Sequence, residues 1–202
     1  MQVLTERKAP TAGSRLTRAI LRMGGWRVFF DGLPETCGVI IIYPHTSNWD
    51  FVVGMLAKWA MGISAAFLGK DTLFRVPILG RCMRYWGGIA IDRSGSHGVI
   101  AGMAARLREA SARGEQLWLA VAPEGTRKLG THWKRGFYHI TVEAGVPIGL
   151  AFFDYARREV GLTEFFHLTG DEATDLARIA AYYVERGSGR NPSQATPIRF
   201  AP

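Results

Sequence analysis

The sequence predicts an α/β fold, in which a mostly parallel central sheet is flanked by helices and preceded by an N-terminal amphipathic helix. Short apolar runs alternate with helical patterns along most of the 202 residues, as in proteins built from strand–helix–strand units. The composition is 48% hydrophobic and 21% charged, which suits a folded core and excludes a disordered chain. The length favours one domain over residues 14–186, between a flexible lead-in at 1–13 and a loose tail at 187–202.

The first helical pattern begins at Ser14 and is amphipathic. Its apolar and basic residues fall on different faces: Leu16, Ala19, Ile20 and Met23 on one, Arg15, Arg18 and Arg22 on the other. Such a helix can lie in a membrane interface, where its arginines meet anionic headgroups. It can also be a surface helix packed on its own domain, and the sequence leaves both interpretations open.

The apolar runs after this helix predict buried strands, and the segments between them predict helices. The strands are expected at Gly38–Tyr43, Ile63–Leu68, Gly87–Asp92, Leu117–Ala122 and Pro147–Phe153, with one more in 159–168. The helices are expected near Trp49–Gly62, Pro77–Trp86, Ser96–Arg113, Thr131–Ala144 and 171–186. Gly145 and Pro147 supply a stop signal for the fourth of these helices.

The net charge and the cysteine content indicate the kind of partner and the cellular compartment. The net charge of +8 predicts an anionic partner, which is a nucleic acid, an acidic membrane surface or a phosphorylated substrate. The two cysteines, Cys37 and Cys82, match no metal or disulfide pattern and favour a reducing compartment. The first residues lack the apolar core of a signal peptide. The apolar stretch 51–68 contains Lys58 and two glycines, so a buried helix followed by a strand explains it better than a membrane span.

In open α/β sheets, functional side chains gather in the loops that follow the strands. The first such loop reads "PHTSNWD", and Ser47 with Asp50 resembles a helix capping box, which explains both residues structurally. Capping does not explain His45, whose side chain can accept a proton near neutral pH. If the chain turns between His45 and Asp50, the carboxylate can hold one ring nitrogen and leave the other free as a base.

The later strand ends offer cations. Lys70 follows the second strand, Arg93 follows the third, and Arg127 lies in the glycine turn "PEGTRK" after the fourth. Because parallel strands end at one edge of the sheet, these cations are expected to converge and to bind a phosphate together with helix N-termini.

These motifs resemble those of the glycerolipid acyltransferases, the family of bacterial 1-acylglycerol-3-phosphate acyltransferases. "HTSNWD" is similar to their H-x4-D motif, "GGIAIDR" to their second block, "APEGTRK" to the third and "GVPIGLAF" to the fourth, in order from about residue 36 to 153. Ala122 replaces the usual phenylalanine and Lys128 a frequent serine. The resemblance implies transfer of a fatty acyl group from acyl-CoA or acyl carrier protein to the hydroxyl of a lysophospholipid, without an acyl-enzyme intermediate.

The resemblance also implies roles for residues. His45 would be the general base and Asp50 would orient it, whereas the acceptor would be bound by Arg93, Glu124, Gly125, Thr126, Arg127 and Lys70. Glu124 could instead pair with Arg127 and stiffen the loop. No metal and no cofactor besides the acyl thioester is expected, and the protein would act at the cytoplasmic face of the inner membrane as a peripheral or monotopic enzyme.

The sequence leaves several alternatives open. The acceptor could be a lyso-ornithine lipid or a glycolipid. Alternatively, the chain could be a non-catalytic basic module that binds anionic lipid or nucleic acid. No nucleic-acid-binding motif appears in the sequence, so a nucleic acid is not expected as a partner. An apolar slot for the acyl chain could be lined by Phe51, Met55, Trp59, Phe67 and Leu68, which could equally be ordinary core residues.

Overall fold

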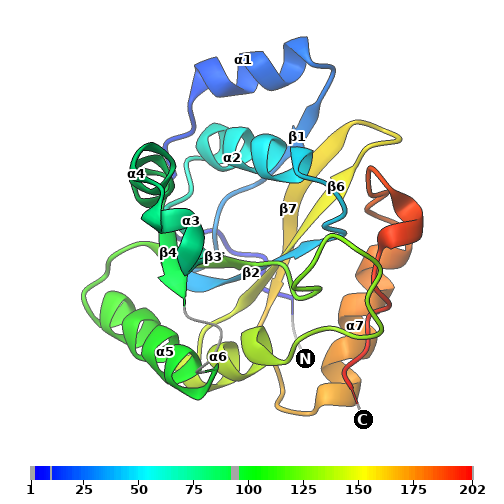
Figure 1. Cartoon of the computed structure of the whole chain (residues 1–202). Coiled ribbons are helices and arrows are strands. Elements are labelled where there is room, and N and C mark those ends of the chain that lie inside the picture. The colour runs from blue at the N-terminus through cyan, green and yellow to red at the C-terminus, as the bar shows by residue number, and fades with distance from the viewer. Residues whose placement is uncertain (1–2, 10, 92–95, 202) are drawn as a thin grey trace.

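The computed structural model describes residues 3–9, 11–91 and 96–201 as an α/β sandwich around one twisted sheet (Figure 1). The described sheet has seven strands in the order β1-β7-β6-β2-β5-β3-β4. The strands are β1 (Arg27–Phe29), β2 (Cys37–Tyr43), β3 (Ala65–Lys70), β4 (Gly88–Ile91), β5 (Leu117–Val121), β6 (Ile148–Asp154) and β7 (Glu159–Phe166). All neighbours are parallel except β6 and β7, which confirms the predicted fold class.

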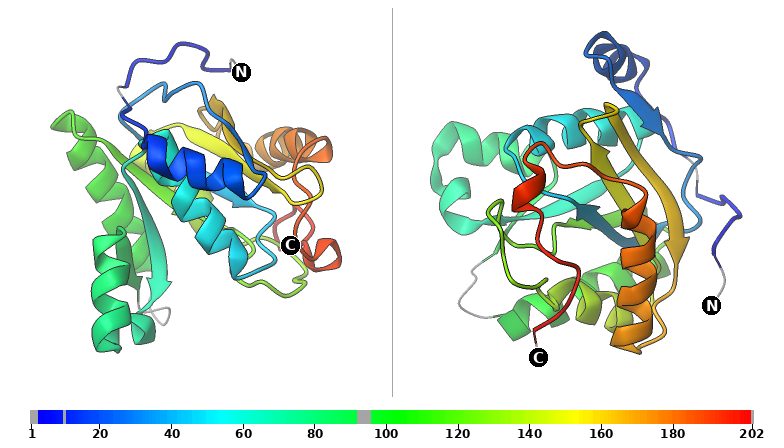
Figure 2. Two further views of the ribbon diagram at one scale, coloured as in Figure 1. Left: turned by 90° about the horizontal axis from the view of Figure 1, so that it is seen from above. Right: turned by 90° about the vertical axis from the view of Figure 1, so that its right-hand side faces the viewer.

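Helices cover both faces of this sheet. They are α1 (Arg15–Met23), α2 (Trp49–Met61), α3 (Asp71–Arg75), α4 (Pro77–Tyr85), α5 (Ser96–Ala112), α6 (Gly136–Ala144) and α7 (Glu172–Val184). Figures 1 and 2 show α2 on one face with α1 stacked outside it, and α5, α6 and α7 on the other face. Each face buries its own apolar core, one around Val53, Ala57 and Ile40, the other around Leu107, Ile140 and Ile179.

The sequence pattern explains most of these elements. The central strand β2 is buried from Cys37 to Ile41 because both of its faces are covered by helices. Helix α2 ends at Gly62, which adopts a left-handed conformation (φ 72°) that glycine accepts without strain. Helix α6 ends in the same way at Gly145.

Several elements differ from the sequence predictions. Helix α6 begins at Gly136 and not at Thr131, because Trp133 is extended and pairs with the tail, donating its N–H to the carbonyl of Arg199 (2.7 Å). Strand β1 and helix α3 were not predicted. They contain only three and five residues, too few to show a periodic pattern.

The tail predicted to be loose is instead packed against the body of the protein. Residues 187–201 return from the end of α7 and run beside the loops that follow β2 and β5 (Figure 2). The lead-in is also anchored: Leu4 N–H donates to the carbonyl of Phe165 (2.8 Å), and Ala9 is buried and bridges to Leu33. Both predictions missed backbone hydrogen bonds, which leave no trace in composition.

Helix α1 turns its apolar stripe outward. Leu16, Ile20 and Met23 are 71%, 44% and 88% exposed, whereas Leu21 is buried against the protein. The inward face also uses Arg18, whose guanidinium donates to the carbonyl of Ala60 (3.1 Å). Among the described residues, none of the helices combines the length and the apolar character needed to cross a membrane.

Candidate active site

The turn between β2 and α2 brings His45 and Asp50 together. Nδ1 of His45 lies 3.1 Å from Oδ2 of Asp50, where it is buried. The distance allows electrostatic contact, although the pair does not meet hydrogen-bond geometry. The His45 side chain is 20% exposed, and because Nδ1 is buried, this exposure belongs to its other atoms.

Asp50 is almost fully buried and is held by hydrogen bonds on both oxygens. Oδ2 accepts the backbone N–H groups of Thr46 and Ser47 (2.8 Å each), and Oδ1 accepts the hydroxyl of Tyr155 (2.7 Å). Burial by itself raises the pKa of Asp50, but the close contact with His45 and the hydrogen bonds from Tyr155 and Ser47 outweigh it, so that the pKa lies below its usual value. The carboxylate therefore stays ionised beside the imidazole.

One half of the predicted capping box is present in the same turn, whereas the N-cap residue of α2, Asn48, makes no side-chain capping hydrogen bond. Asp50 reaches back to the N–H of Ser47, and Ser47 Oγ accepts the N–H of Trp49 (3.2 Å). The structural interpretation of Asp50 and the functional one are therefore not alternatives. The hydrogen bonds between Asp50 and the backbone at the start of α2 hold the turn in which the carboxylate also contacts His45.

Glu124 is buried, and each of its carboxylate oxygens accepts a backbone hydrogen bond. Oε2 accepts the backbone N–H of His45 (2.5 Å), and Oε1 accepts the backbone N–H of Thr196 (2.9 Å). Burial raises the pKa of Glu124, although these hydrogen bonds oppose the rise. The carboxylate is thus a bridge between His45 and the tail. The alternative pairing with Arg127 has no counterpart among the described contacts of Glu124.

The rest of the "EGTR" turn is exposed. Gly125 takes a positive φ (66°), as expected for the glycine in this turn, and Thr126 Oγ1 accepts the N–H of Lys128 (3.2 Å). The Arg127 side chain is exposed at the same edge of the sheet as His45, since β2 and β5 are parallel neighbours. Thr126 and Arg127 remain available to a ligand at this edge.

Lys70 and Arg93 belong to strands farther along the sheet. Lys70 is exposed at the end of β3, which is two strands from β2, or about 10 Å at the usual strand spacing. It pairs in register with Ile91, the last residue of β4. Arg93 lies outside the described residues.

The C-terminal segment, for which no role was predicted, completes the site. Asn191 donates its backbone N–H to Thr46 Oγ1 (3.1 Å) and its side-chain amide to the Thr46 carbonyl (3.0 Å). With its amide nitrogen facing acceptors, Gln194 donates to the Arg127 carbonyl (2.7 Å). One segment therefore ties both motif loops together. It also places the guanidinium of Arg190 5.4 Å from the ring centre of Trp49.

Tyr155 is a second residue that sequence reasoning missed. It comes directly after β6, so inspection of the loop at the end of the fifth predicted strand would have reached it. Its hydroxyl contacts Asp50 from a point 105 residues later in the chain.

The predicted acyl slot does not form as a set. Phe67 and Leu68 are consecutive in β3, so their side chains point to opposite faces, and Leu68 packs against the core beneath α5 and α6. Of the predicted residues, Phe51 packs against Phe67, with ring centres 5.4 Å apart. Phe51 also packs against Trp86 (6.0 Å), a residue that was not part of the predicted slot. These three rings form an apolar cluster beside the first turn of α2.

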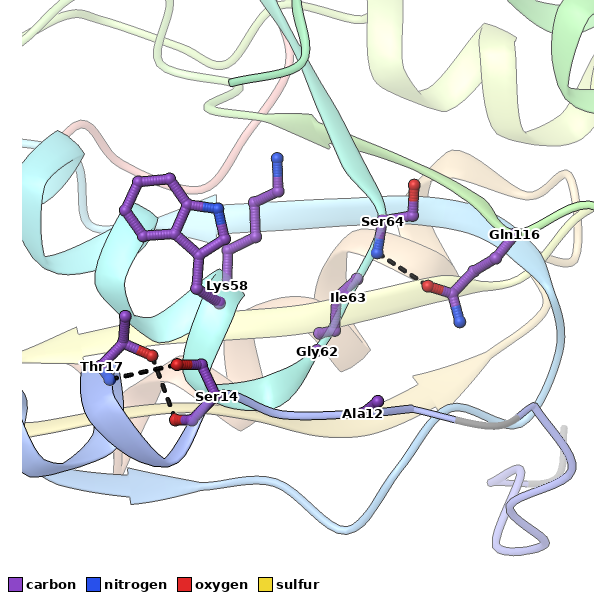
Figure 3. A pocket seen from close by; sticks show the side chains of 9 residues that line it. Ala12, Ser14, Thr17, Lys58, Gly62, Ile63, Ser64 and Gln116 are labelled. Carbon is purple, nitrogen blue, oxygen red and sulfur yellow. Dashed lines mark hydrogen bonds between the residues drawn. The ribbon is translucent and has the colours of Figure 1, made fainter. Parts of the chain in front are cut away.

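A pocket elsewhere on the molecule is separate from this site. It is lined by the start of α1, the end of α2 and the start of β3, and by Gln116 (Figure 3). Within it Ser64 N–H donates to Gln116, and Ser14 caps α1. The pocket lies at the opposite end of α2 from Asp50, a helix of 13 residues or about 20 Å.

Comparison with known proteins identifies the family. A family model described as "Acyltransferase" matches residues 27–149. The chain belongs to the acyltransferase family. This acyltransferase also resembles the crystal structure of PlsC, the 1-acyl-sn-glycerophosphate (LPA) acyltransferase of Thermotoga maritima, with a TM-score of 0.55 and 14% identity over 84% of this chain and 74% of that one. The likeness supports the fold. A comparison with curated proteins gave no match.

Proposed function

We propose that this acyltransferase moves a fatty acyl group from acyl-CoA or acyl carrier protein to the hydroxyl of a lysophospholipid such as 1-acylglycerol-3-phosphate, with His45 as general base. The observation that supports this most directly is the 3.1 Å approach of His45 Nδ1 to a buried, ionised Asp50 at the carboxyl edge of the sheet. Membership of the acyltransferase family, shown by the match over residues 27–149, adds to it.

The chemistry needs one base and good positioning, because a thioester is already reactive. Asp50 holds the proton on Nδ1 of His45, which leaves Nε2 to accept the proton of the acceptor hydroxyl. The oxygen attacks the thioester carbonyl, the tetrahedral intermediate collapses with cleavage of the C–S bond, and the imidazolium returns the proton to the thiolate. The products are an ester and a free thiol, and no acyl-enzyme forms.

The acceptor's anionic group would be held by the cations along the same edge, namely Arg127, Lys70 and Arg93. Arg127 and Lys70 are exposed there, which supports the assignment. A phosphate-bearing acceptor then predicts that Arg127→Ala raises KM for the lysolipid. An unchanged KM would favour an acceptor without phosphate, such as a lyso-ornithine lipid or a glycolipid.

The decisive test compares histidine variants of the purified protein, using a labelled acyl thioester and a panel of lysolipids read by mass. His45→Ala and Asp50→Asn are each expected to abolish acyl transfer without loss of the fold. His139→Ala provides the control, because His139 is an exposed histidine of α6 on the other face of the sheet. Turnover like that of the wild type in His45→Ala would refute the proposal.

We further propose that α1 binds the cytoplasmic face of the inner membrane as a peripheral element. Its exposed stripe of Leu16, Ile20 and Met23 is flanked by arginines, as in helices that lie in an anionic interface. Helix α2, packed beside it, exposes Trp49 and Val52. Met23→Asp should reduce co-sedimentation with anionic vesicles while soluble-substrate turnover is kept. Binding of duplex DNA without thioester consumption would instead favour a non-catalytic basic module.

A further inference from the structure

We propose that Tyr155 is a positioning residue for the acyl transfer, whose hydroxyl fixes the Asp50 carboxylate in the orientation that presents Oδ2 to His45. The inference rests on the proposed function. It adds a residue from outside the acyltransferase motifs, in the turn between β6 and β7.

The two oxygens of Asp50 have different surroundings. Oδ2 is occupied by the N–H groups of Thr46 and Ser47 and lies beside His45. For Oδ1, the hydrogen bond found among the described residues is the one from Tyr155, at 2.7 Å. Since Asp50 is only 2% exposed, loss of that donor would leave a buried charged oxygen without a partner, which is costly. The carboxylate would then rotate or draw in water.

Tyr155 is itself fixed in place, so its hydroxyl has a defined position. Its backbone N–H donates to the carbonyl of Ser188 (2.8 Å), and its ring meets Trp26 edge to face, with centres 5.0 Å apart. Burial, and then the contact with Asp50, raise the pKa of Tyr155 well above its usual value. The hydroxyl therefore keeps its proton near neutral pH and can donate it to Asp50 in a hydrogen bond.

The charged and titratable groups around this pair come from four segments. His45 and Asp50 belong to the turn after β2, Glu124 to the loop after β5, Tyr155 to the β6–β7 turn and Arg190 to the C-terminal segment. Arg190 acts on Tyr155 through space and favours its ionised form, but burial and Asp50 dominate. Removal of the tyrosine hydroxyl is therefore expected to act mainly on Asp50, whose pKa it helps to lower.

The test compares Tyr155→Phe with Tyr182→Phe in the acyl-transfer assay. Tyr182 is a matched control, because it is a buried tyrosine whose hydroxyl pairs with Thr163 (2.7 Å) and the Leu150 carbonyl (3.2 Å). Tyr155→Phe should lower kcat about ten-fold or more, the effect of losing one hydrogen bond to a charged group, with little change in KM for the thioester. It should also move the acidic limb of the pH–rate profile to higher pH, because Asp50 loses a donor that favours its ionised form.

A structural role alone predicts a different pattern. In that case both variants would lose similar activity and stability, and neither would move the acidic limb, which would overturn the inference. Wild-type kcat and profile in Tyr155→Phe, with His45→Ala inactive, would overturn this inference and leave the proposed function standing. Wild-type turnover in His45→Ala would refute the proposed function itself.

A second measurement does not depend on the choice of lipid. With 15N-labelled histidine, the wild-type NMR spectrum should show the His45 ring protonated on Nδ1 and bare on Nε2. Tyr155→Phe should increase the fraction of the other tautomer, whereas Tyr182→Phe should leave the spectrum unchanged. An unaltered His45 signal in Tyr155→Phe contradicts the inference whatever the acceptor is.

Discussion

Replacing Glu124 by glutamine tests whether this buried carboxylate works as a bridge. The glutamate accepts two backbone N–H groups, one from His45 and one from Thr196. Glutamine has the same shape but only one acceptor oxygen, and its amide nitrogen must face the other N–H group. Glu124→Gln therefore breaks the link at one of its two ends.

The magnitude follows from two opposing effects on stability. Loss of one hydrogen bond to a charged group costs about 1.5–3 kcal/mol. The raised pKa of Glu124 shows that burial disfavours the charge, so a neutral side chain recovers part of this loss. The free energy of unfolding should thus fall by less than about 2 kcal/mol. Activity should fall far more, about 100-fold, because a shift of about 1 Å in a reacting group has that effect.

Glu124→Ala provides the contrast. It removes both acceptors and leaves two buried N–H groups unpaired, at about 1–3 kcal/mol each. Urea unfolding and kcat measured on the same preparations separate the two effects. Wild-type kcat in Glu124→Gln, or an alanine variant as stable as the glutamine variant, would show that the bridge does not hold His45.

Three further predictions concern the tail, pH and the core. Asn191→Ala should lower kcat several-fold, because the Thr46 carbonyl loses the hydrogen bond from the Asn191 amide. Ser193→Ala, in the same segment, should leave kcat unchanged. Equal effects of the two changes would contradict a role of Asn191 in positioning the turn around Thr46. The pKa of Asp50 is below its usual value of 3.8, so the ionised carboxylate stabilises the fold above pH 3.8. This stabilisation is lost as the pH falls through the pKa that Asp50 has in the folded protein. When the free energy of unfolding is measured at decreasing pH, Asp50→Asn should therefore lose less stability below pH 3.8 than the wild type does. Gly38→Ala should destabilise the protein by about 1–3 kcal/mol, because its Cβ would lie 2.3 Å from the Trp118 ring; an unchanged melting temperature would contradict this packing.

The parts of the fold that sequence could predict are those with periodic burial. Strand β2 and helix α2 each bury a regular set of apolar residues, and their existence was predicted to within two residues. The approach of His45 to Asp50 was also predictable, because the carboxylate of Asp50 reaches back to the N–H of Ser47 and the chain must turn between them. Contacts of this kind form between residues that are close in the sequence, so the local sequence predicts them.

The parts that sequence missed depend on contacts between distant backbone groups. The hydrogen bonds of Glu124 to the N–H groups of His45 and Thr196 were not predicted, because any residue except proline could supply those groups. Asn191 reaches Thr46 across 145 residues, and its own neighbourhood of small and polar residues resembles a free end. The position of Tyr155 after a predicted strand is a weak signal, because a single tyrosine there is common. Only the assembled sheet brings these groups together.

The C-terminal segment, residues 187–196, is synthesised after the rest of the site that it contacts. During translation the turn that contains His45 and Asp50 leaves the ribosome long before Asn191 does, and all seven described strands precede Asn191. The central sheet can therefore assemble first, while the turn around Thr46 still lacks its final bonds. A chain cut short after α7 would keep its sheet but lose these contacts. We expect removal of residues 187–196, or a tag joined near Phe200, to disturb these contacts and with them the proposed acyl transfer.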